Sequence, residues 1–255
     1  MRKNLRYLIL LLILLFVAVN EALNKTRSTS WENPLWVRIY AINGDGREAT
    51  DSYIDSLTTR SFEMTENFVN REARRYGIRI DAIDVAYNGR LPSGPPQPPS
   101  GQSLLENIWW SLKFRAWATY RGWKSDSEAG DVELFVNYYD TETAQSLRHS
   151  VGLQGGLIGI INAFADMSYN GSNQVVIAHE LMHTLGASDK YNPENLPIHP
   201  QGYAEPYRNP LHPQQKAEIM GGRIPLSAQV SKMPESLNQV VIGSYTAAEI
   251  NWPVE

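Results

Sequence analysis

Two histidines and a glutamate near residue 180 have the types and spacing needed to hold a metal ion beside a general base. His179 and His183 are four residues apart, so on a helix both imidazoles project from the same face. Two imidazoles at this spacing can bind one zinc ion. Glu180 is turned about 100° around the helix, which can bring its carboxylate beside a metal-bound water rather than onto the metal. The pattern therefore predicts metal-assisted hydrolysis.

The residues that follow supply a third ligand. Gly186 suits the left-handed position that ends a helix, and a sharp turn there can bring Asp189 back toward the imidazoles. Two nitrogens, one carboxylate oxygen and a water complete a tetrahedral site with one exchangeable position, as in catalytic zinc sites. The long, proline-rich segment 191–213 holds the alternative third ligands His199, Glu205 and His212, and the candidate charge-stabilising hydroxyls Tyr191, Tyr203 and Tyr207.

A structural alternative is that both histidines are satisfied inside an apolar helix. The additional glycine and aspartate make the full pattern far rarer by chance, so metal binding is favoured. The run from His179 to Asp189 resembles the metzincin zinc-protease motif H-E-x-x-H-x-x-G-x-x-H/D. Its aspartate form is similar to the snapalysin-like branch of small secreted metalloproteinases. The resemblance implies a protease fold over about residues 35–252.

Two further segments are assigned through this resemblance. Residues 149–165 are expected to form a short edge strand, a glycine bend and a buried strand that leads to the zinc helix. In the family the edge strand receives an extended peptide, which would place Gly152, Leu153 and Gln154 along the substrate cleft. The glycines serve equally well as bulge residues. Met220 lies in a glycine turn similar to the metzincin Met-turn, although Gly222 replaces the tyrosine that many members carry two residues later.

The flanking sequence predicts an α/β fold: a mostly parallel twisted sheet with an antiparallel edge strand, and two long helices that include the zinc-binding helix. Strands are expected over residues 35–42, 78–87 and 131–139. One helix is expected over residues 52–76 and another over 103–120. Their expected core residues are Ile54, Leu57, Met64 and Phe68 in the first helix, and Leu105, Ile108, Trp109 and Leu112 in the second.

Helix ends are predicted from capping residues. Ser172 or Asn173 can cap the zinc helix at its N-terminus. The segments 234–241 and 246–252 read as one terminal helix or two short pieces, with Thr246 as the N-cap of the second.

The N-terminus is expected to carry the protein out of the cytoplasm. Basic residues precede an apolar run over residues 7–19, which is typical of a secretory signal or a short signal anchor. The run is shorter than the ~20 residues that span a bilayer, but no clean cleavage site follows it, so an uncleaved anchor is favoured slightly over secretion. Residues 1–23 are assigned to this segment, 24–34 to a stalk and 35–255 to the metalloprotease domain.

The composition agrees with one folded domain. The 255 residues are 42% hydrophobic and 20% charged, with a net charge of -4 and no cysteine. The lack of cysteine excludes disulfides and thiolate metal ligands, so any metal must be held by His, Asp or Glu. The charge does not favour nucleic acid. We expect a monomer whose substrate is a peptide or protein.

The expected activity is a zinc-dependent endopeptidase in which Glu180 takes a proton from the zinc-activated water and passes it to the leaving amine. One alternative is a membrane-anchored binding or scaffold protein on a zincin fold with a non-catalytic zinc site. A further alternative, suggested by the aromatic helix and the N-terminal segment, is a membrane-associated assembly factor.

Overall fold

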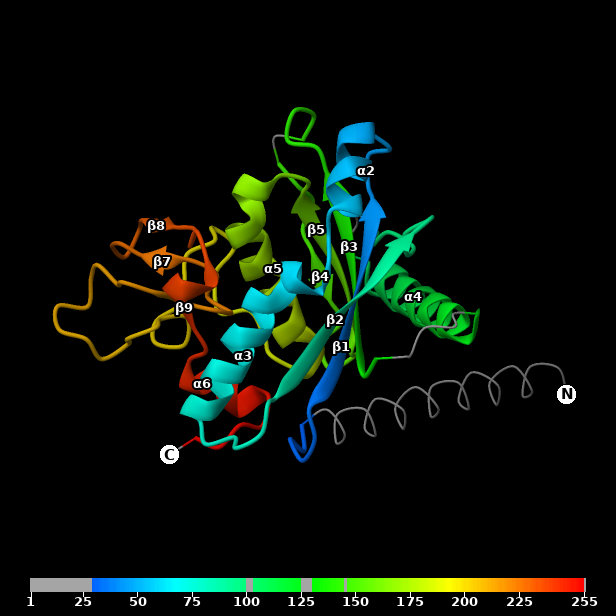
Figure 1. The fold of residues 1–255 in the computed structure, drawn as a ribbon. Helices are drawn as coiled ribbons and strands as arrows, with labels where there is room; N and C mark the ends of the chain where they lie inside the picture. The colour runs from blue at the N-terminus through cyan, green and yellow to red at the C-terminus, as the bar shows by residue number, and fades with distance from the viewer. Residues whose placement is uncertain (1–28, 100–102, 125–129, 145, 255) are drawn as a thin grey trace, which may run out of the picture.

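The computed structural model describes residues 29–99, 103–124, 130–144 and 146–254, which form a mixed α/β fold around one five-stranded sheet (Figure 1). The strands are ordered β2-β1-β3-β5-β4, and all neighbours are parallel except β4 and β5. They are β1 (Leu35–Asn43), β2 (Ile83–Leu91), β3 (Val132–Tyr139), β4 (Val151–Gly152) and β5 (Ile158–Phe164). The predicted mixed α/β class with a mostly parallel sheet and an antiparallel edge is therefore confirmed.

Helices cover both faces of the sheet (Figure 1). They are α2 (Glu48–Asp55), α3 (Glu63–Arg75), α4 (Leu104–Lys124), α5 (Asn170–Leu185) and α6 (Ser244–Glu249). One core joins the sheet to α3 and α5, and a second core joins the opposite face to α4. In β1, Ile39 belongs to the first core and Tyr40 to the second, as expected of a central strand that is buried on both faces.

The expected single helix over residues 52–76 is two α-helices with a short 3-10 helix, η1 (Thr59–Phe62), between them. Thr58 is extended, with φ -137° and ψ 173°, and its N–H donates to Ser61 Oγ at 3.0 Å. This local hydrogen bond starts a new helix and so breaks the predicted one. Phe68 is buried in the core as expected, whereas Met64 is 38% exposed, which corrects its assignment to the core face.

The second strand begins at Ile83 rather than at residue 78. Gly77 adopts φ +83° just after α3, and residues 78–82 form the connection that follows it. The Asn70 side chain then binds both the N–H and the carbonyl of Ile83 at 3.0 Å. This contact between the helix and the backbone fixes where the strand starts, and the sequence pattern alone does not reveal it.

The aromatic helix α4 packs on the sheet through a different face from the one predicted. Trp110, Phe114 and Ala118 are buried against Phe135 and Ile160. The Trp110 indole N–H donates to the Pro96 carbonyl at 2.7 Å, which holds the proline-rich loop against the helix. The predicted core residues Leu105, Ile108 and Trp109 are exposed and Leu112 is half-buried.

The C-terminal segment contains a strand that was predicted as helix. Val240–Val241 forms β9, which pairs in parallel with β6 (Ala217–Glu218) after the 3-10 helix η3 (Leu237–Gln239). The last helix begins after Gly243, so Thr246 lies inside it and is not its N-cap. The Thr246 hydroxyl instead donates to the buried carboxylate of Glu218 at 2.7 Å.

The described part of the predicted stalk packs against the domain. The Trp31 indole N–H donates to the Ile250 carbonyl at 2.8 Å, and its ring meets Trp252 edge-on at 5.7 Å. The folded unit therefore extends back to about Thr29. Within the described residues, no helix is both long and apolar enough to cross a bilayer, and the predicted signal or anchor over residues 1–23 lies outside them.

Candidate metal centre

Helix α5 carries the two histidines and is anchored at its first turn to the neighbouring strand. The Asn173 side chain accepts a hydrogen bond from Phe164 N at 3.1 Å and donates to Phe164 O at 2.9 Å. Ser172 and Asn173 therefore lie inside the helix, which follows Tyr169 and the 3-10 helix η2 (Met167–Tyr169), so their prediction as N-caps is wrong. This anchoring sets the position of α5 under the sheet edge.

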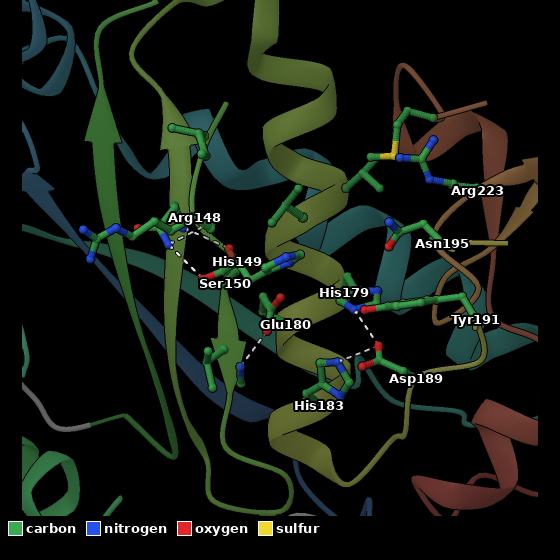
Figure 2. A pocket seen from close by; sticks show the side chains of 18 of the residues that line it. Arg148, His149, Ser150, His179, Glu180, His183, Asp189, Tyr191, Asn195 and Arg223 are labelled. Atoms are coloured by element: carbon green, nitrogen blue, oxygen red, sulfur yellow. Dashed lines mark hydrogen bonds and ion pairs between the residues drawn. The ribbon is translucent and has the colours of Figure 1, made fainter. Parts of the chain in front are cut away.

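The helix ends as the sequence predicted. Gly186 has φ +115°, and the Ala187 N–H bonds to the Met182 carbonyl at 3.0 Å, which closes the last turn. The chain then reverses and places the Asp189 carboxylate against both imidazoles (Figure 2). Asp189 Oδ1 lies 3.3 Å from His179 Nε2 and 3.1 Å from His183 Nε2.

These three side chains form a site that could hold a metal ion. Their ligand atoms all lie within 4.8 Å of one another. Among the described residues, this is the one group of three or more His, Cys, Asp or Glu side chains that could hold a metal ion. Partial burial acts to raise the pKa of Asp189, but the hydrogen bonds and charge of the two histidines outweigh it and lower the pKa well below its ordinary value. Asp189 is therefore an ionised ligand at neutral pH.

Each histidine is oriented by a backbone carbonyl. His179 Nδ1 lies 2.8 Å from Ile219 O, and His183 Nδ1 lies 2.8 Å from Ala187 O. A carbonyl only accepts hydrogen bonds, so this chemistry assigns the proton of each neutral ring to Nδ1. In such a neutral ring the Nε2 lone pair can bind a metal, which would take the place of the proton that Nε2 shares with Asp189, and both rings are held in the orientation that binds it.

Glu180 lies beside the three ligands and is bound to the edge strand. Its Oε2 accepts a hydrogen bond from Gly152 N at 2.6 Å, and the residue is 5% exposed. Burial raises the pKa of Glu180 above its ordinary value, although the nearby histidines and the Gly152 N–H act to lower it. A carboxylate with a raised pKa next to a metal site is suited to proton transfer.

The segment after Gly186 is pinned by a nearly buried lysine. Lys190 Nζ donates to the Ser188 carbonyl at 3.0 Å and to the Glu249 carboxylate at 2.7 Å. Lys190 N also donates to Met220 O at 2.9 Å. Asp189 therefore lies between residues that are tied to α6 and to the Met220 turn, which limits its movement relative to the histidines.

The alternative third ligands are not in the site. His199 Nε2 contacts the Pro206 carbonyl at 3.0 Å, and His212 Nε2 contacts the Tyr203 hydroxyl at 3.1 Å. Glu205 is exposed and forms an ion pair with Arg208. All three are outside the group of ligand atoms, so Asp189 is the third member of the cluster.

Among the three candidate tyrosines, Tyr191 lies at the site. Its ring stacks at 6.3 Å on His179, and Figure 2 shows its hydroxyl pointing toward the metal ligands. Burial raises the pKa of Tyr191, and the Asp189 carboxylate raises it further. The hydroxyl therefore keeps its proton at neutral pH. Tyr203 is bound to His212 and Tyr207 is 86% exposed, away from the cleft lining.

A cleft of about 980 Å³ runs past the metal ligands. Gly152 and Gln154 line it, as predicted, but Leu153 does not and instead packs with the core under α4. A Cβ on Gly152 would lie 2.5 Å from Glu180 O and 2.7 Å from His183 Cβ. The close approach of β4 to α5 therefore explains why position 152 is a glycine.

The Met220 turn supports His179 through its backbone. Met220 is fully buried, and the preceding residue supplies the carbonyl that orients His179. The turn is organised by Glu218, which was not predicted from the sequence. Its buried carboxylate accepts hydrogen bonds from Met220 N at 2.7 Å, Gly221 N at 2.9 Å and Gly243 N at 3.0 Å. The one sequence feature that points to this role of Glu218 is the presence of a glutamate within the otherwise apolar run A-E-I-M.

The fold and the site define a mixed α/β protein with a His-His-Asp cluster suited to a metal and an adjacent glutamate. No protein-family model matches this chain, and no curated protein shows significant sequence similarity to it.

Proposed function

We propose that this protein is a metzincin-like zinc endopeptidase. The observation that carries the proposal is the convergence of His179, His183 and Asp189 beside Glu180, with both histidine Nδ1 atoms engaged by backbone carbonyls. A purely structural metal site has no need for a buried glutamate beside an open cleft. The geometry therefore favours hydrolysis over the scaffold alternative.

The residues present fit zinc. Two neutral imidazole nitrogens and one carboxylate oxygen are a common catalytic zinc set, with the fourth position open to water. Metals that require mainly oxygen ligands, such as Ca²⁺ and Mg²⁺, fit this donor set poorly. When bound, zinc supplies a Lewis acid that lowers the pKa of water toward ~7 and polarises a carbonyl.

Glu180 acts as the proton carrier in this proposal. The Gly152 N–H holds Oε2 at 2.6 Å, which fixes the direction of the carboxylate. The carboxylate accepts a proton from the attacking water and delivers it to the nitrogen of the leaving amine. The protonated Tyr191 hydroxyl donates a hydrogen bond to the carbonyl oxygen of the substrate as negative charge develops there.

The substrate is a peptide in extended form. β4 is the last strand of the sheet and, among the described strands, is paired on one side only, with β5. A peptide aligned with the free side of β4 would lie in the cleft and place its carbonyl groups near Glu180. Gly152 and Gln154 then contact its backbone. The N-terminal segment remains a proposed membrane anchor or secretion signal that would place the domain outside the cytoplasm.

The test combines metal content with cleavage. We expect one zinc ion per chain by elemental analysis in the wild type and in Glu180→Gln. The wild type should cleave members of a broad peptide library, and Glu180→Gln should lose about 10²–10⁴-fold in kcat/KM. Glu194→Gln, which changes an exposed glutamate, is the matched control and should keep wild-type activity. Full zinc occupancy without cleavage dependent on Glu180 would favour the binding-module alternative.

A further inference from the structure

The cleft wall opposite β4 carries a cation that has no carboxylate partner among the described residues. Arg223 is half-buried and lines the cleft, and no described carboxylate lies within ion-pair distance of its guanidinium. Figure 2 shows Asp189, Tyr191, Asn195 and Arg223 on this wall, with Arg223 farthest from the metal ligands. Arg223 therefore faces a part of the cleft that a bound peptide would reach beyond the His179–His183–Asp189 cluster.

The position of Arg223 is fixed by the residues on either side of it. Gly222 has φ +69°, and its N–H donates to the Glu218 carbonyl at 2.9 Å. Ile224 is buried and begins β7 (Ile224–Pro225), which pairs with β8 (Ser231–Lys232). The backbone on either side of Arg223 is thus fixed, so binding a ligand would order the side chain and not the loop that carries it.

The charges around the cleft leave Arg223 available to a substrate anion. The two carboxylates that line the cleft are already engaged, Glu180 by Gly152 N and Asp189 by the histidines. Arg148 also lines the cleft, but Figure 2 shows its guanidinium directed away from the metal ligands. A guanidinium is a planar set of donors that pairs with a carboxylate through two parallel hydrogen bonds.

We propose that Arg223 binds a carboxylate of the substrate, so that the protein selects peptides with an acidic group on the part of the chain that runs past Arg223. The carboxylate belongs either to an Asp or Glu side chain or to the C-terminus of the peptide. The inference rests on the proposed function for the position of the peptide.

Binding experiments test the inference without requiring turnover. Zinc-loaded Glu180→Gln is titrated with one peptide sequence in versions that carry Glu or Gln at each of eight successive positions. A C-terminal acid and a C-terminal amide of the neutral version distinguish the two sources of the carboxylate. We expect one acidic version to bind about five- to tenfold more tightly than its neutral counterpart, as for a partly exposed ion pair.

Substitution of Arg223 supplies the decisive comparison. In the Glu180→Gln background, Arg223→Gln should abolish the acidic preference, and Arg223→Glu should reverse it so that the Gln version binds more tightly than the Glu version. Arg79→Gln, which changes an exposed arginine on the segment before β2, should leave the preference intact. An unchanged preference in Arg223→Gln, or no preference in the parent protein, would overturn the inference.

A cleavage experiment separates this inference from the proposed function. With active protein, Arg223→Gln should still cleave neutral peptides and lose only the acidic preference in kcat/KM. Cleavage that depends on Glu180 but is indifferent to Arg223 refutes the inference and leaves the proposed function intact. Acid-selective binding that depends on Arg223, without any cleavage, supports the carboxylate site and refutes the peptidase.

Discussion

Each histidine of the His179–His183–Asp189 cluster has one ring nitrogen against a backbone carbonyl and the other facing Asp189. The carbonyls of Ile219 and Ala187 hold the Nδ1 atoms of His179 and His183. Asp189 stands within 3.3 Å of both Nε2 atoms. Because both imidazoles are oriented by backbone carbonyls and already face Asp189, little reorganisation would be required when a metal binds.

Removal of the third ligand should destroy the metal site. Asp189→Ala leaves two imidazoles without the anionic ligand. Changing a group that only orients a ligand lowers metal affinity by up to about 100-fold, so we expect loss of the ligand itself to lower zinc affinity by more than about 100-fold. Competition with a chromophoric chelator measures the affinity. His199→Ala, at an alternative ligand, should leave it unchanged. A normal affinity in Asp189→Ala together with a loss in His199→Ala would show that the third ligand has been misassigned.

At the scale of secondary-structure elements, the proposed function depends on the contact between β4 and α5. Gly152 has no room for a Cβ, since one would lie 2.5 Å from the Glu180 carbonyl oxygen. The same residue donates to the Glu180 carboxylate through its N–H. The edge strand, helix α5 and the proposed general base Glu180 therefore all depend on the residue at position 152.

Gly152→Ala should displace the edge strand and misdirect Glu180. We expect kcat/KM to fall by at least about tenfold and stability to fall by ~1–3 kcal/mol, as for other overpacked sites. Gly155→Ala is the comparison, because Gly155 has φ +63° but no described atom within 4 Å of the position that a Cβ would occupy. It should cost ~1 kcal/mol in stability from backbone strain and retain activity. Denaturant unfolding and peptide kinetics measure the two effects, and equal loss of activity in both variants would refute the role of close packing at Gly152.

The ion pair between the Asp189 loop and α6 should make stability depend on pH. Partial burial acts to raise the pKa of Glu249, but hydrogen bonds from Lys190 and Ser188 outweigh it and lower the pKa below its ordinary value of 4.5. The pair therefore stabilises the fold above pH 4.5, and this contribution is lost as pH falls through the lower folded-state pKa.

Replacing Glu249 tests that pH dependence. Glu249→Gln should lower the unfolding free energy by ~1 kcal/mol at pH 7, a modest value because Glu249 is partly exposed. The difference from wild type should shrink as pH falls below 4.5 and through the lower folded-state pKa. Urea unfolding at several pH values gives the comparison, with the exposed Glu235→Gln as control. A difference that grows toward low pH would contradict the assigned sign.

Local patterns predicted the convergence of His179, His183 and Asp189 better than they predicted the helix and strand boundaries. His179, Glu180 and His183 share one helix turn, and Gly186 supplies the local reversal that brings Asp189 back. Glu218 and the Lys190–Glu249 pair could not be predicted, because their roles come from partners distant in the sequence. The same limit explains β2, whose start is set by Asn70.

At the scale of the whole molecule, the sheet separates two cores and places the metal site at one edge. The first core includes α5 and Met220 under the sheet, while α4 closes the other face. Trp31 and Trp252 pack against each other and join the two ends of the described chain. Lys190 links the segment that carries Asp189 to the Met220 turn and to α6, so these three parts form one connected unit.

Zinc should stabilise this unit as a whole. Free zinc at 100 times its dissociation constant adds ~2.7 kcal/mol to the folded state, which for a chain of this size corresponds to a rise in Tm of roughly 5–10 °C. Scanning calorimetry with and without chelator measures the shift. Asp189→Ala should show little shift at the same zinc concentration. An equal shift in that variant would place the stabilising zinc elsewhere.

The central claim is that one zinc ion in the His179–His183–Asp189 site, with Glu180, hydrolyses peptides. Its most direct test is to strip the protein with chelator and restore zinc stepwise while cleavage of a library-derived peptide is followed. We predict no cleavage by the stripped protein and activity that reaches its maximum at one zinc per chain. Cleavage that persists without zinc, or that fails to return at any zinc ratio while the fold is intact, would contradict the claim.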